Sequence, residues 1–147
     1  MKRRKLLQIL GLIPPALLAA SCKEKLPSTP TIVTGKVIDE NGLPLEGAGL
    51  RLTGRNIKGY GGYSTFSITI ESDKDGLYRL SQFVPKDTNE MSILPYTTSK
   101  VPISVGFGGY LSYIFLKGKY TEIGSPYNIP RSEWGKTTTL NYQFIKI

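Results

Sequence analysis

After residue 30, apolar and polar residues alternate with a period of two along most of the chain, and short clusters of turn-forming residues interrupt the alternation. This period is typical of half-buried β-strands, whereas an amphipathic helix repeats its apolar residues at a longer spacing. The interruptions include Asn41-Gly42 and Asp75-Gly76, where glycine tolerates the positive φ of a tight turn. The alternation predicts strands at 31–38, 48–53, 63–71, 77–83, 103–107, 110–116 and 137–147.

Many short strands separated by turns predict an all-β fold, and the β-sandwich is the common way to build one. We expect a single Ig-like sandwich of about seven strands over residues 31–147. The glycine-rich segment 54–62 is expected to be a loop, and the polar segment 124–135 a long connection.

The first 21 residues follow a different pattern. Basic residues at positions 2–5 precede an apolar run that ends in the small residues Ala19, Ala20 and Ser21. These are the parts of a secretory signal peptide. The apolar run is about 15 residues long, too short for a membrane-spanning helix of ~20 residues. We therefore expect residues 1–21 to be cleaved and the protein to be exported.

Cys22 is the only cysteine and directly follows the expected cleavage site. Residues 18–22, LAASC, resemble the lipobox of bacterial lipoproteins, which implies that Cys22 takes a diacylglycerol and becomes the first residue of the mature chain. Two acyl chains are enough for stable anchoring. Residues 22–30 would then be the lipidated cysteine and a spacer, and the missing Asp after Cys22 implies the outer membrane, on its periplasmic or surface face. The alternative is an ordinary signal peptide followed by a free cysteine.

Two segments carry a second resemblance. Residues 35–52 (GKVIDENGLPLEGAGLRL) and 72–80 (SDKDGLYRL) resemble the carboxypeptidase regulatory-like domain. This implies a transthyretin-like sandwich in which 84–100 and 118–136 are insertions, and a motif that serves turns and packing rather than chemistry. The pattern is also similar to intradiol ring-cleaving dioxygenases, whose iron site needs two histidines that this chain lacks.

The composition of the chain excludes several kinds of catalytic and metal site. The chain has no histidine, which excludes Ser-His-Asp and Cys-His catalysis and the usual His/Cys zinc sites. We expect no enzymatic activity, no cofactor and no metal. The chain carries 19 basic and 11 acidic residues, and loss of the signal peptide removes four basic residues and lowers the charge from +8 to +4. The remaining basic residues are dispersed, which favours a solvated surface over nucleic-acid binding.

Three aromatic residues are candidate ligand contacts: Tyr60 and Tyr63 in the glycine-rich segment, and Trp134 in the polar connection. Aromatic faces stack on sugar rings or form protein contacts. The alternatives are an inward-packed Tyr63 and a Trp134 that covers one end of the sandwich. Asp73 and Asp75 resemble part of a calcium loop, but the other ligands are missing, so a plain turn is favoured.

These observations predict a lipid-anchored, non-enzymatic protein of the bacterial envelope that acts as a binding or accessory module. Its expected partners are the membrane, through Cys22, and a polysaccharide or envelope protein, through loops at one end of the sandwich. The alternative is a structural spacer or assembly subunit that pairs through a strand edge, with residues 137–147 as the candidate strand.

Overall fold

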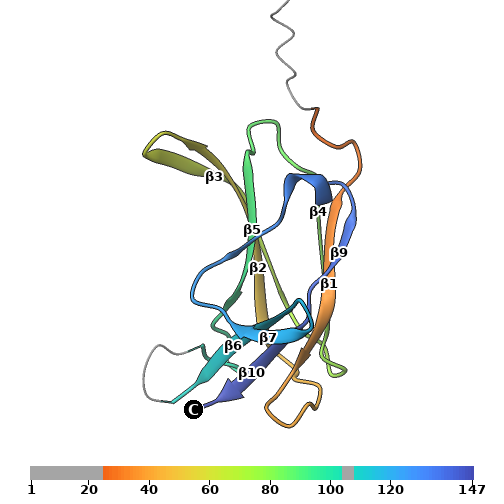
Figure 1. Cartoon of the computed structure of the whole chain (residues 1–147), viewed down its shortest axis with the longest axis vertical. Coiled ribbons are helices and arrows are strands. Elements are labelled where there is room, and N and C mark those ends of the chain that lie inside the picture. The colour runs from red at the N-terminus through yellow and green to blue at the C-terminus, as the bar shows by residue number, and fades with distance from the viewer. Residues whose placement is uncertain (1–24, 104–107) are drawn as a thin grey trace, which may run out of the picture.

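The structure, a computed structural model, describes residues 25–103 and 108–147. In these residues, ten β-strands form two sheets, and one short 3-10 helix, Arg131–Glu133, is the only helical segment (Figure 1). The predicted all-β sandwich is confirmed, with ten described strands in place of about seven. The signal peptide and Cys22 lie outside the described residues.

The larger sheet is built around β1, whose bounds match the first predicted strand. One side of β1 pairs antiparallel with β4, and the other side pairs parallel with β9 and then with β10. The order is β4-β1-β10-β6-β7, with β9 joined to β1. The bounds are β1 Thr31–Ile38, β4 Leu77–Gln82, β6 Tyr110–Leu116, β7 Lys119–Glu122, β9 Thr137–Thr139 and β10 Tyr142–Lys146.

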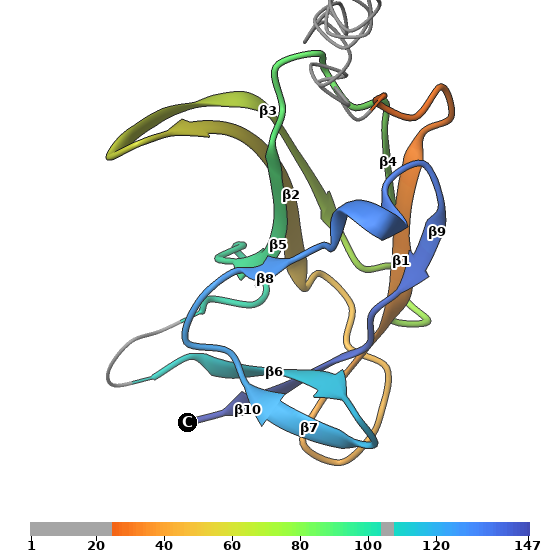
Figure 2. The same cartoon turned by 45° about the horizontal axis from the view of Figure 1, so that its top comes forward.

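The smaller sheet has the order β3-β2-β5-β8 and faces the larger sheet across the core (Figure 2). β2 is its centre, because β2 pairs antiparallel with β3 on one side and with β5 on the other. The edges are therefore β3 and the very short β8. The bounds are β2 Gly49–Lys58, β3 Gly61–Glu71, β5 Glu90–Tyr96 and β8 Tyr127–Asn128.

The core lies between the inner faces of the two sheets. Alternation places every second side chain inward, as the burial pattern of β1 shows. Burial of one such side chain contributes about 1.5–3 kcal/mol relative to its exposure. The largest apolar side chains with almost no exposed surface are Val33, Val37, Leu50, Leu52, Met91, Ile93, Val101, Tyr142 and Phe144.

Three sequence-based expectations on the strands are wrong. No strand was expected in segment 84–100, but β5 runs through it and places Met91 and Ile93 in the core. The C-terminal segment is two strands, since the chain breaks between β9 and β10. β10 is also not an edge strand, because it pairs with β1 and with β6. Pairing with another protein through β10 would require these ladders to open.

Two predicted turns are confirmed and share one geometry. Asp39 Oδ1 accepts from the backbone N–H groups of Asn41 (2.8 Å) and Leu43 (2.9 Å). Asp73 Oδ1 accepts in the same way from Asp75 and Leu77, both at 2.9 Å. Each turn also has a glycine at positive φ three residues after the aspartate. The aspartates are therefore turn-forming residues that connect successive strands.

The described part of the expected spacer is packed on the sandwich. Leu26 is half-buried against the core, and Thr29 Oγ1 donates to the carbonyl of Gly135 at 2.8 Å. The sandwich domain thus begins before residue 31. No helix in residues 25–103 and 108–147 is long and apolar enough to cross a membrane.

Candidate functional site

The segment expected to be a glycine-rich loop is instead the end of a long β-hairpin. β2 and β3 pair up to Lys58 and Gly61, with one shift of register between Gly54 and Arg55, which leaves Gly59 and Tyr60 as a two-residue turn. Gly59 has φ +60° and Tyr60 does not have positive φ, which is the pattern of a type II′ turn. This turn suits the twist of paired strands, so strand pairing continues where the composition suggested a loop.

The stem of this hairpin is held by the loop that precedes β5. The Asn89 side chain accepts from Ile57 N–H at 2.8 Å and donates to Ile57 O at 2.7 Å, in the manner of a neighbouring strand. The Asn89 N–H also donates to Arg55 O at 2.9 Å. On the β3 side, the hydroxyls of Thr65 and Thr88 lie 2.7 Å apart. The buried Asn56 donates its side-chain N–H to the carbonyl of Asp87.

The tip of the hairpin presents two aromatic side chains to solvent. Tyr60 is fully exposed, and Tyr63 is 55% exposed, so the inward-packed alternative for Tyr63 does not hold. Arg55 and Lys58 are exposed on the same hairpin, and no acid occurs between residues 49 and 70. The hairpin therefore combines aromatic faces with positive charge. It projects away from the body of the sandwich (Figure 1).

Trp134 is not an exposed contact, and that expectation is wrong. Its side chain is 6% exposed, and the indole N–H donates to Ile129 O at 3.1 Å. The guanidinium of Arg131 lies 5.0 Å from the ring centroid and covers part of the indole. Trp134 therefore closes the core beneath the 3-10 helix, which is the packing alternative for this residue.

The Asp73 side chain forms hydrogen bonds within its own turn. One oxygen of Asp73 already accepts two backbone hydrogen bonds, and these two bonds are the ones that form the turn. Among residues 25–103 and 108–147, no group of three or more acidic, histidine or cysteine side chains is placed to hold a cation. The plain-turn interpretation of Asp73 and Asp75 is therefore the one that the geometry favours.

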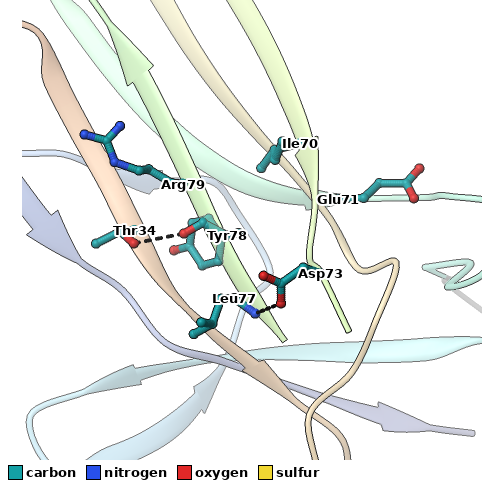
Figure 3. Close-up of a pocket in the computed structure, with 7 residues that line it drawn as sticks. All are labelled: Thr34, Ile70, Glu71, Asp73, Leu77, Tyr78 and Arg79. Atoms are coloured by element: carbon teal, nitrogen blue, oxygen red, sulfur yellow. Dashed lines mark hydrogen bonds between the residues drawn. The ribbon is translucent and has the colours of Figure 1, made fainter. Parts of the chain in front are cut away.

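An open groove of about 380 Å³ lies beside this turn, between β3 and β4 (Figure 3). Its two hydroxyl groups are engaged: Thr34 Oγ1 donates to Tyr78 O at 2.9 Å, and Tyr78 Oη donates to Leu140 O at 2.6 Å. Burial raises the pKa of Tyr78 far above the usual tyrosine value, so its hydroxyl stays neutral. The groove is lined by Thr34, Ile70, Glu71, Asp73, Leu77, Tyr78 and Arg79.

Sequence reasoning identified the exposed tyrosines but missed what holds them. Asn89 stands 32 residues from Ile57, and nothing local to Asn89 indicates that it completes the hairpin stem. The hairpin, in contrast, had a local signal in the sequence. A glycine followed by one residue between two alternating runs is compatible with a type II′ turn.

No protein-family model and no curated protein matches this chain. Among solved structures, the major pilin subunit BcpA of Bacillus cereus is similar over 81% of this chain, with 21% identity and a TM-score of 0.45. This chain spans only 31% of that subunit. The plantain pollen allergen Pla l 1 is similar over 80% of this chain and 94% of its own, with 18% identity and a TM-score of 0.42.

The 3-chlorocatechol 1,2-dioxygenase of Rhodococcus opacus 1CP is similar over 85% of this chain and 63% of its own, with 11% identity and a TM-score of 0.42. These similarities concern the β-sandwich alone. They assign neither a family nor a function to this chain.

Proposed function

We propose that this chain is an exported, lipid-anchored protein of the bacterial envelope, without enzymatic activity, that binds a partner through the tip of the β2–β3 hairpin. One observation carries the binding role: Tyr60 is fully exposed at the end of a hairpin whose stem is held by five hydrogen bonds from residues 87–89. An exposed ring held in this way forms a contact at low cost, since little ordering of the hairpin remains to be done on binding.

The chemistry of the tip favours a polar partner. Tyr60 and Tyr63 offer faces for sugar rings or for protein side chains, while Arg55 and Lys58 favour acidic groups. The partner that fits is an envelope polysaccharide or an envelope protein. The absence of histidine and the engaged hydroxyls of the groove support a role without catalysis.

The short tether supports a partner close to the membrane. Three peptide steps separate Cys22 from Lys25, and a fully extended chain spans at most about 3.6 Å per residue. A lipid on Cys22 would therefore hold Lys25 within about 11 Å of the anchored residue. Figures 1 and 2 place the start of the described chain and the tip of the hairpin toward the same end of the sandwich. An anchored chain would present the hairpin near the bilayer surface.

The test is photo-crosslinking in living cells. A benzoylphenylalanine placed at Tyr60 should give a discrete crosslinked product. The same group at Phe83 should not, because Phe83 is also exposed, at 62%, but lies outside the hairpin. The product is then digested with protease or with glycosidases to learn which class of partner is attached. Equal products at both positions, or none at position 60, would contradict the binding role of the hairpin.

A second candidate function is assembly through a strand edge. The observation that favours it is the length of β3, which has 11 residues, pairs only with β2 in the described part of the chain, and leaves its other side open. Backbone N–H and C=O groups on such an edge are available to a strand from another chain.

A further inference from the structure

We infer that the open side of β3, hereafter the β3 edge, is a self-association surface that pairs antiparallel with the β3 edge of a second copy of this chain. This deepens the assembly role just described and is independent of what the hairpin tip binds. The inference rests on four points. β3 lacks the protection that the other strand edges have, and its backbone groups point to the open side. One register of β3–β3 pairing satisfies these groups and the side chains, and the charges are complementary in that register.

The other open edges in the described residues are protected in the usual ways. β4 carries Arg79, and β7 has four residues, two of them charged. β8 has two residues, and the part of β5 beyond it contains Pro95. Short length, charge and proline all discourage pairing with another chain. β3 has none of these features from Gly61 to Ile70, which is ten successive residues without charge or proline.

The backbone of β3 is directed to accept a second strand. Ser72, just beyond the strand, donates its N–H to Ala48 O at 2.9 Å and accepts from Gly47 N–H at 2.9 Å, so its groups point toward the β2 side. Backbone direction alternates along a strand. The N–H and C=O groups of Ser67 and Thr69 therefore point to the open side.

One register satisfies both the backbone and the side chains. With the two-fold axis at Ile68, Ser67 faces Thr69 of the second copy, so the outward groups of both strands form hydrogen bonds. The same register places Ile70 against Phe66 of the second copy. Shifting it by one step in either direction would place Ile70 or Phe66 opposite a serine. The central register thus also covers Ile70, a large apolar side chain that is exposed in the single chain.

Charge is complementary in this arrangement. Glu71 is the only acid from residue 49 to residue 71, and it lies at the C-terminal end of β3. Antiparallel pairing brings Glu71 beside the N-terminal half of the other β3, whose neighbour in the sheet carries Arg55. The groove between β3 and β4 borders the same end of the edge, at Ile70 and Glu71 (Figure 3).

A cysteine at the axis tests the register in the full-length, membrane-anchored protein. Residues at a pair without mutual hydrogen bonds have Cα atoms about 4.5 Å apart, within the range of a disulfide. Ile68→Cys should therefore form a disulfide-linked dimer on mild oxidation of intact cells. Thr121→Cys, exposed on the edge strand β7, and the wild type with its native Cys22 are the matched controls. Dimer yields no higher than those of the controls would overturn the inference.

Two further changes separate pairing from misfolding. Thr69→Pro in the Ile68→Cys background removes an outward N–H without touching the β2 ladder, and should lower the dimer yield about tenfold, whereas Thr69→Val should not. Should the proline variant be degraded in cells, Glu71→Arg provides the same test on an exposed side chain: it lowers the yield, and adding Arg55→Glu restores it. Unchanged yields in the proline and charge variants would overturn the inference, and neither result bears on the position-60 crosslink.

Discussion

Two buried tyrosines in the core provide a matched pair for a stability test. Tyr78 and Tyr142 have ring centroids 6.1 Å apart, and each is almost fully buried. Tyr78 Oη donates to Leu140 O at 2.6 Å, whereas Tyr142 Oη has no hydrogen-bond partner in the described residues. Replacing either residue with phenylalanine keeps the ring and removes only the hydroxyl. The two substitutions should therefore have different effects.

Tyr78→Phe leaves the buried carbonyl of Leu140 without this donor and should lower the free energy of unfolding by about 1–3 kcal/mol. Tyr142→Phe removes a buried hydroxyl that gains no hydrogen bond, so stability should stay within about 0.5 kcal/mol of the wild type or rise. For a domain of this size, 1 kcal/mol corresponds to a Tm shift of about 4 °C.

The assay is urea unfolding followed by circular dichroism at neutral pH, with the midpoint and slope fitted for wild type and both variants. Equal slopes would show that the substitutions change stability and not the extent of unfolding. A loss for Tyr142→Phe equal to or larger than that for Tyr78→Phe would refute the hydrogen-bond assignment in this part of the core.

Three more predictions concern the same fold. Burial raises the pKa of Tyr78 and of Tyr142 well above the usual value of about 10. Above pH 10, therefore, only the unfolded chain releases these protons, and the free energy of unfolding should fall by up to about 1.4 kcal/mol per pH unit for each tyrosine. Urea unfolding between pH 9 and pH 11 measures this fall. Gly76→Ala should lower the free energy of unfolding by about 2 kcal/mol or more in the same assay, because φ is +73° and the new Cβ meets the carbonyl of Val37. Gly42→Ala is the control: its φ is +77° but the space around it is open, so the loss should be only about 1 kcal/mol. Asn89→Ala removes two hydrogen bonds to Ile57 and should speed tryptic cleavage after Lys58 several-fold, whereas an unchanged rate would mean that the stem is held by the strands alone.

The sequence predicted the strands whose alternation is regular and missed those that depend on distant partners. β1 and the aspartate turns follow from local pattern and turn chemistry. β5 was missed because its run, EMSILPY, has three buried residues in succession and a proline, and neither feature suggests alternation. Its place beside β2 is fixed by pairing with residues about 40 positions earlier in the chain.

The candidate site was predictable in part for the same reason. Tyr60 stands between two glycines, so its exposure could be predicted from the local composition. Trp134 also stands in a polar segment, but its burial depends on Ile129 and on the core beneath it, which local polarity does not reveal. The open edge of β3 follows from the order of strands in the sheet, so it appears only once the topology is known.

Lipid anchoring at Cys22 is the claim on which the membrane-proximal role of the hairpin depends. The direct measurement is metabolic labelling with an alkyne-bearing fatty acid, followed by membrane fractionation of wild type beside Cys22→Ser. The account predicts a labelled wild-type protein in the membrane fraction and an unlabelled variant that is not processed to the wild-type mature form. A wild type without label, or a Cys22→Ser variant with the same size and labelling as wild type, would contradict it.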